Sequence, residues 1–110
     1  SLTQWLLMGI TTFRHNTQLT IYLLIHSSTL DGRLIQEFRD SYANIDNITE
    51  YLIDLENVQH IDSAIMGLLL VLYGEMKEQK NQATLKIINA APHILDILLN
   101  AKINEYYEIV

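Results

Sequence analysis

The sequence predicts a single α/β domain with a mixed, mostly parallel sheet and the element order β-β-α-β-α-β-α-β. Its 110 residues suit one domain with one core. Hydrophobic residues make up 49% of the chain and charged residues 18%, so there is enough apolar material for a folded core. After an opening pair of strands, helical patterns alternate with strand patterns. That alternation is typical of right-handed crossovers between parallel strands.

The first half of the chain predicts a hairpin followed by an amphipathic helix. Strands are expected at Thr11 to His15 and Leu19 to Ile25, joined by the polar turn His15-Asn16-Thr17-Gln18. Between Asp31 and Tyr42, apolar residues recur at intervals of one, three and four, while Arg39 and its charged neighbours fall on the opposite side. This spacing predicts a helix with one buried face.

The second half predicts two further strand–helix units and a closing strand. Tyr51 to Leu55 is a short, nearly continuous apolar run, as expected of a central strand covered on both faces. Asp62 and Ser63 form an N-cap signal for a helix that runs to about Lys80. Pro92 suits the first turn of the last helix. The remaining elements are a strand at 84–88, that helix at 92–102 and a strand at 106–110.

Charge and composition argue against several classes of partner and compartment. Thirteen acidic and seven basic side chains give a net charge of −6, and the basic residues do not cluster, so no nucleic acid is expected to bind. The absence of cysteine fits a cytoplasmic protein without disulfides. The longest apolar run, Ala64 to Tyr73, is about half of the ~20 residues that cross a bilayer, so no membrane insertion is expected.

No enzyme motif is present in the sequence. There is no glycine-rich phosphate loop, and the histidines, at positions 15, 26, 60 and 93, lack the spacing of metal ligands. Most carboxylates lie at predicted helix-surface or turn positions, where solvation explains them. We therefore predict no catalytic residue, no cofactor and no metal site, and expect a protein that is not an enzyme.

Ser63 stands out because it lies where a buried strand leads, through a loop, into a helix N-terminus. Such loops, at the carboxyl ends of strands, are where ligands and partners meet an α/β sheet. One interpretation is structural: the hydroxyl caps the helix. The other is regulatory, since a phosphate on Ser63 would be tolerated at the positive end of the helix and would change the charge shown to a partner. The spacing leaves both open.

The segment from Asp54 to Leu70 resembles the signature of the STAS family, the anti-sigma factor antagonist domains. The pattern D-L-x-x-V-x-x-I/M-D-S-x-G-L-G-x-L-L is matched in order and without gaps by Asp54, Leu55, Val58, Ile61, Asp62, Ser63, Gly67, Leu69 and Leu70. Two weaker matches flank it, Leu30-Asp31-Gly32-Arg33 upstream and Pro92-His93-Ile94 downstream. The resemblance spans about residues 11–110 and implies a STAS-like fold.

The resemblance implies a non-enzymatic bacterial regulator that binds an anti-sigma factor of the serine kinase type. Ser63 matches the phosphoacceptor of the family, and Asp31 matches an acidic residue of a neighbouring loop. The expected partner-binding residues are Asp31, Asp62, Ser63, Ala64 and Met66. One alternative is a constitutive accessory subunit of a transport or signalling complex, with Ser63 only a cap. A small-ligand or nucleotide sensor has little support, because no phosphate loop is present.

The sequence departs from the family pattern at three places. Ala64-Ile65 replace a small residue and a glycine, so the bulkier helix start is expected to alter the approach of a kinase, and Lys102 stands where a glycine is common. The family's final helix has no counterpart before Val110. Residues 1–10 are therefore predicted to be an apolar extension that covers the sheet through Trp5, Leu6 and Leu7, within the chain or across a homodimer. The alternative is a flexible terminus or a cloning remnant.

Overall fold

The computed structural model describes residues 8–25, 32–80 and 82–110, which form a five-stranded sheet with the strand order β1-β2-β3-β4-β5. β1 pairs with β2 in an antiparallel hairpin, and β2, β3, β4 and β5 are parallel neighbours. The predicted mixed, mostly parallel α/β fold is confirmed. The elements are β1 (Met8–His15), β2 (Gln18–Ile25), α2 (Gly32–Asp40), β3 (Glu50–Asp54), α3 (Ser63–Glu78), β4 (Thr84–Ile88), α4 (Pro92–Asn100), the 3-10 helix η1 (Ile103–Glu105) and β5 (Glu108–Ile109).

The two ends of the sheet differ from the sequence expectation. β1 begins at Met8 instead of Thr11, so Gly9 and Ile10 pair with β2 and belong to the sheet. At the other end, η1 takes the residues before the last strand, and β5 is limited to Glu108–Ile109. Lys102, with φ 61° and ψ 30°, leads into η1 in the left-handed conformation that glycine adopts most easily.

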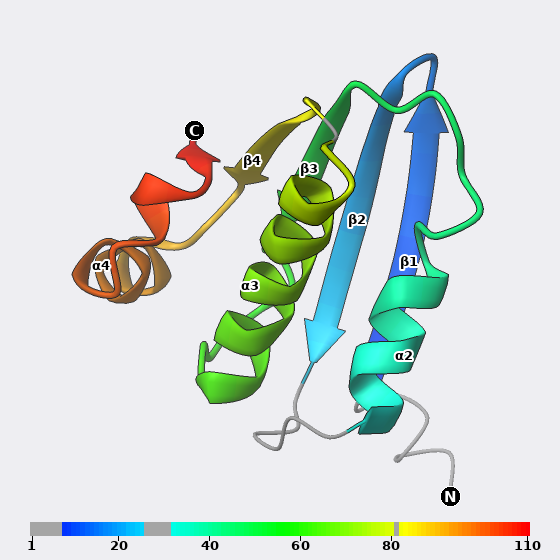
Figure 1. Ribbon diagram of the computed structural model, residues 1–110. Helices are drawn as coiled ribbons and strands as arrows, with labels where there is room; N and C mark the ends of the chain where they lie inside the picture. Colours follow the sequence, from blue (N-terminus) through cyan, green and yellow to red (C-terminus); the bar gives the residue numbers. More distant parts are fainter. Residues whose placement is uncertain (1–7, 26–31, 81) are drawn as a thin grey trace, which may run out of the picture.

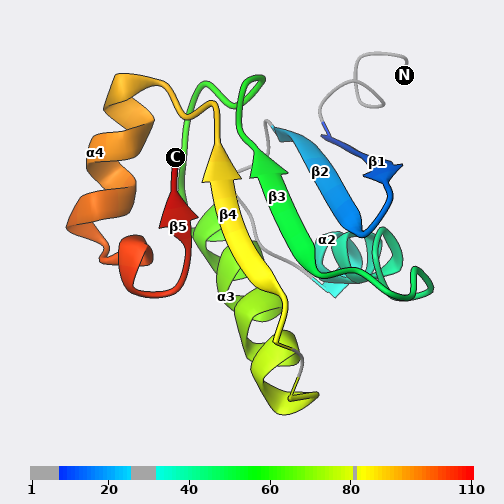
Figure 2. The same ribbon diagram turned by 90° about the horizontal axis from the view of Figure 1, so that it is seen from above.

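The core lies between the sheet and two helices. α2 and α3 pack against one face, and α4 lies beside the β5 edge (Figures 1 and 2). Paired residues of neighbouring strands share a face, which places Ile21, Ile53 and Ile87 in one fully buried row. α3 packs onto these strands with Leu68, Leu69 and Leu72, all 0% exposed.

The expectation that β3 is covered on both faces is wrong for the described part of the chain. On the side away from α2 and α3, Phe13, Thr20, Leu52 and Lys86 form one cross-strand row. Leu52 is only partly buried, and Phe13 is 59% exposed. Within the described part of the chain this face of β3 is therefore only partly covered, although Thr20 in the same row is 6% exposed.

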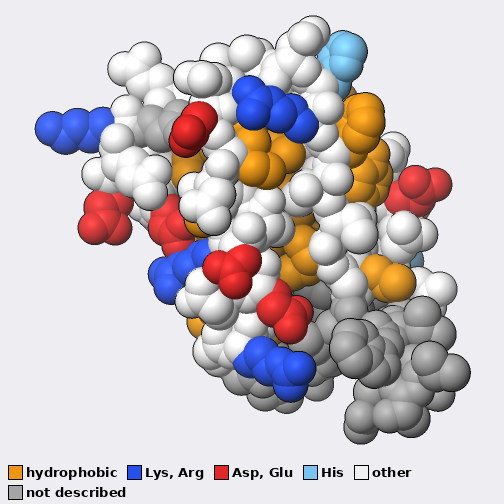
Figure 3. Space-filling model, turned by 90° about the vertical axis from the view of Figure 1, so that its right-hand side faces the viewer, with side chains coloured by type: hydrophobic (Ala, Val, Ile, Leu, Met, Phe, Trp, Pro, Cys, Tyr) orange, Lys and Arg blue, Asp and Glu red, His pale blue; other side chains and the backbone are white. Residues whose placement is uncertain are grey.

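The predicted cover of the sheet and the possible homodimer stay predictions. Trp5, Leu6 and Leu7 lie outside the described residues. Seen from the β1 side, the molecule shows hydrophobic side chains in separate areas between polar and charged groups (Figure 3). Among the described helices, none is long and apolar enough to cross a membrane.

Candidate functional site

The start of α3 divides two roles between adjacent residues. Asp62 is the N-cap: its carboxylate accepts hydrogen bonds from the backbone N–H groups of Ala64 at 3.0 Å and Ile65 at 3.3 Å. Ser63 is the first helical residue and is exposed. Its hydroxyl makes no hydrogen bond to the residues that the structure describes. The interpretation of Ser63 as the cap is therefore wrong, because Asp62 already holds the free amides.

Three polar contacts hold the loop that leads to Ser63. Asp54, 5% exposed at the end of β3, accepts hydrogen bonds from the backbone N–H of Glu56 at 2.8 Å and from Asn89 Nδ2 at 3.1 Å. Farther along, His93 Nε2 lies 2.8 Å from the carbonyl oxygen of Gln59. These contacts join the loop to the ends of β3 and β4 and to α4, next to Asp62 and Ser63.

The predicted partner-binding residues do not all face outward. Asp62 and Met66 are partly exposed, but Ala64 is 0% exposed, so its side chain does not contact a partner. Asp31 lies outside the described residues. The accessible surface at the start of α3, called here the α3 surface, consists of Asp62, Ser63 and Met66.

Ile65 also faces the core. Its side chain is 1% exposed, although the sequence pattern suggested a bulkier surface at this position. The added volume therefore lies inside the protein and not on its surface, and the effect on the approach of a kinase stays a prediction. Compared with the glycine of the family pattern, Ile65 changes the packing beneath the α3 surface.

Tyr107, which no sequence motif marks, holds α3 through a hydrogen bond in the core. Tyr107 is 2% exposed and donates its hydroxyl hydrogen bond to the carbonyl oxygen of Leu69 at 2.6 Å. Burial raises the pKa of Tyr107, so the phenol keeps its proton and remains a donor. No spacing rule identifies this pair, because the two residues are far apart in the sequence and meet only in the folded core.

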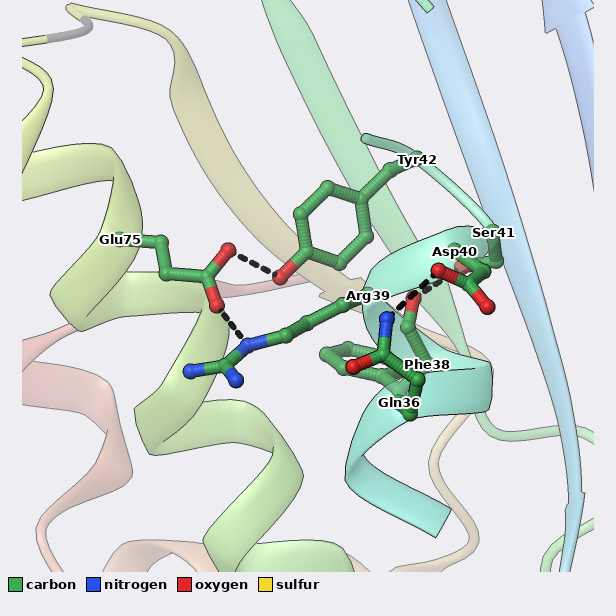
Figure 4. A network of polar contacts seen from close by, with 7 residues as sticks. All are labelled: Gln36, Phe38, Arg39, Asp40, Ser41, Tyr42 and Glu75. Carbon is green, nitrogen blue, oxygen red and sulfur yellow. Dashed lines mark hydrogen bonds and ion pairs between the residues drawn. The ribbon is translucent and has the colours of Figure 1, made fainter. Parts of the chain in front are cut away.

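A second polar cluster joins α2 to the other end of α3. Glu75 accepts hydrogen bonds from the Tyr42 hydroxyl, at 2.8 Å, and from the Arg39 Nε group (Figure 4). Burial raises the pKa of Tyr42, and the hydrogen bond to Glu75 raises it further. The sequence placed Arg39 on the polar side of its helix and most carboxylates on solvated surfaces, whereas the structure pairs Arg39 with Glu75 between helices.

The described ranges contain no candidate cluster of metal ligands. No group of three or more histidine, aspartate or glutamate side chains lies close enough together there to hold a metal ion. The chemistry available at the α3 surface is that of one exposed hydroxyl beside one carboxylate, on a helix N-terminus that attracts negative charge.

Two comparisons bear on this arrangement. The chain is 32% identical over 76 residues to the STAS-domain containing protein PA14_20770 of Pseudomonas aeruginosa (strain UCBPP-PA14), covering 67% of this chain and 72% of the relative. The chain belongs to the STAS family. The fold agrees: an anti-sigma-factor antagonist (STAS) domain protein from Planctomyces limnophilus superposes with a TM-score of 0.71 at 19% identity, over 91% of this chain and 87% of the other. No family model matches the sequence.

Two aspartates of the segment that resembles the STAS signature hold the loop before α3 and the start of the helix. Asp54 holds the loop through the Glu56 N–H and the Asn89 side-chain amide, and Asp62 caps the helix through backbone amides. Ser63, which directly follows Asp62, makes no side-chain hydrogen bond to a described residue. The STAS fold is compatible with an anti-sigma factor antagonist, a class of regulator that works by protein–protein contact.

Proposed function

We propose that this STAS domain is a regulatory, non-catalytic protein that binds a serine-kinase-type anti-sigma factor through its α3 surface and is switched by phosphorylation of Ser63. The observation that carries the proposal is the exposed Ser63 hydroxyl, which no described residue engages, on a helix already capped by Asp62. Because this side chain makes no stabilising hydrogen bond to the described residues, its modification should change the stability of the fold little.

Phosphorylation at this position changes the surface more than the fold. The Ser63 oxygen would attack the γ-phosphorus of ATP, ADP would leave, and the hydroxyl proton would pass to a base of the kinase. The product carries about −1.5 to −2 charges at pH 7. The N-terminus of α3 attracts that charge, whereas the neighbouring Asp62 carboxylate repels it, so the helix remains formed while the α3 surface becomes strongly acidic.

The departures from the family pattern support access to Ser63. Ala64 and Ile65, which replace a small residue and a glycine, are 0% and 1% exposed. Their side chains add no bulk beside the hydroxyl. A kinase approaching the start of α3 would therefore meet Ser63 flanked by the partly exposed Asp62 and Met66.

Phosphorylation by an anti-sigma factor kinase from the source organism tests the proposal. Incubation with that kinase and ATP should add one phosphate, located on Ser63 by mass spectrometry, and Ser63→Ala should abolish it. Ser41→Ala is the matched control, because the Ser41 hydroxyl is bonded to the Phe38 carbonyl oxygen at 2.5 Å, and it should leave incorporation unchanged. Phosphate on another residue would refute the assignment of Ser63.

Binding to the same anti-sigma factor tests the switch separately. The phosphorylated protein should bind at least about 100-fold more weakly than the unmodified protein, because like charges at an interface cost several kcal/mol. Ser63→Ala should still bind. If the anti-sigma factor does not bind and the protein instead copurifies with the ATPase of a transport complex, the alternative of a constitutive accessory subunit is favoured.

A further inference from the structure

A cavity of about 350 Å³ lies at the opposite end of α3 from Ser63. Its walls come from the segment between α2 and β3, from β3 itself, and from the last turns of α3. Ser63 and Glu75 are separated by about 18 Å along the helix. The cavity is therefore distinct from the α3 surface, and its volume falls at the small end of ligand pockets.

The lining of the cavity is acidic. Asp46 and Glu75 contribute carboxylates, and Asn47 and Gln79 contribute side-chain amides. The lining contains no lysine, arginine or histidine. Glu75 already accepts one hydrogen bond at each oxygen, from Tyr42 and from Arg39, which leaves further lone pairs on both oxygens (Figure 4).

Tyr51 gives the cavity an unused polar group. It lines the cavity and is 4% exposed, and its hydroxyl has no hydrogen-bond partner among the described residues. No buried side-chain polar atom of the described residues lacks a hydrogen-bond partner, so the Tyr51 oxygen is open to solvent and can accept a hydrogen bond from a molecule in the cavity. The ring of Tyr51 also meets that of Tyr42 edge to face, with centroids 6.3 Å apart, so aromatic surface stands beside the carboxylates.

We propose that this cavity binds a small organic cation, a molecule with a primary ammonium or guanidinium group on a short carbon chain. The Tyr51 hydroxyl oxygen and the Asp46 and Glu75 carboxylates accept hydrogen bonds from the cationic group. The aromatic rings and Met76 contact the carbon chain. Arg39 already pairs with Glu75 from the side of α2, so the Asp46 carboxylate, which has no ion pair among the described residues, supplies the main unpaired negative charge of the lining.

Nuclear magnetic resonance titration of the full chain tests the proposal, with n-butylammonium and agmatine as probes and 1-butanol as the neutral analogue. Both cations should shift the amide signals of Asn47, Tyr51 and Gln79 in a saturable way, and 1-butanol should not. Asp46→Asn and Tyr51→Phe should each weaken binding about ten-fold, the effect of losing one charged hydrogen bond. Asp96→Asn is the matched control, because Asp96 is an exposed carboxylate on α4, and it should bind like the unchanged protein.

Three results would overturn this inference. One is the absence of saturable shifts with either cation at concentrations up to about 10 mM, ten times a millimolar Kd. Another is equal binding of 1-butanol. The third is unchanged affinity in both Asp46→Asn and Tyr51→Phe when their melting temperatures show that they are folded. None of these results would bear on Ser63, because the cavity lies at the other end of α3.

Discussion

Replacing Asp62 by alanine should destabilise the protein, whereas replacing Ser63 by alanine should not. Asp62→Ala removes the acceptor for two backbone amides, those of Ala64 and Ile65. Loss of an N-cap costs about 0.5–2 kcal/mol. Loss of a negative charge at a helix N-terminus costs about 0.3–1 kcal/mol more. Asp62→Ala is therefore expected to lower the free energy of unfolding by about 2 kcal/mol.

Urea unfolding at pH 7 measures this difference, with two matched variants. Asp62→Ser keeps a capping oxygen and loses only the charge, so it should cost less than about 1 kcal/mol. Ser63→Ala should change stability by less than about 0.5 kcal/mol, the range of surface substitutions. For a domain of this size, the loss in Asp62→Ala corresponds to a fall in Tm of roughly 8 °C.

The opposite ranking would refute the division of roles at the start of α3. If Ser63→Ala cost more than Asp62→Ala, the serine would be the cap. Its hydroxyl would then be engaged in the folded protein, and the main support for Ser63 as a phosphoacceptor would be lost.

Three further predictions concern the fold that carries the site. Lys102→Gly should raise the free energy of unfolding by about 0.5–1 kcal/mol in urea unfolding, because Lys102 has φ 61°. Tyr107→Phe should lower it by about 1 kcal/mol in the same assay, because it removes the buried hydrogen bond that the phenol donates to the Leu69 carbonyl oxygen. Stability should fall as the pH drops below about 4.5. Hydrogen bonds from Gln18 and Lys86 lower the pKa of Glu50, so the folded state favours its charged form. In Glu50→Gln, the Tm from thermal unfolding should therefore change less between pH 7 and pH 3 than in the unchanged protein.

Local signals in the sequence were sufficient to predict most elements. The β4 boundaries, Thr84–Ile88, agree with the prediction, because the strand is short and polar residues flank it. The capping signal placed the start of α3 at Ser63, as observed. The last strand was predicted too long, because the turn at Lys102 and the 3-10 helix after it depend on a left-handed residue that the sequence does not mark with glycine or asparagine.

The orientation of residues at the start of α3 was not predictable from periodicity. Residues 64–73 are apolar almost all round, so the pattern shows no polar side from which to infer the buried one. The packing of α3 against the sheet sets the orientation: Ala64 and Ile65 are buried, and Ser63 is exposed. The pairing of Arg39 with Glu75 was missed for a related reason, because it depends on how α2 packs against α3 and on no local spacing.

The inward orientation of Ile65 changes how the departure from the family signature is interpreted. At an exposed position, isoleucine in place of glycine would alter the surface that a kinase meets. At a position 1% exposed, it adds buried apolar surface, which stabilises the fold, and a residue with a better helix propensity than glycine. The substitution therefore bears on the stability of α3 and leaves Asp62, Ser63 and Met66 as the accessible groups of the α3 surface.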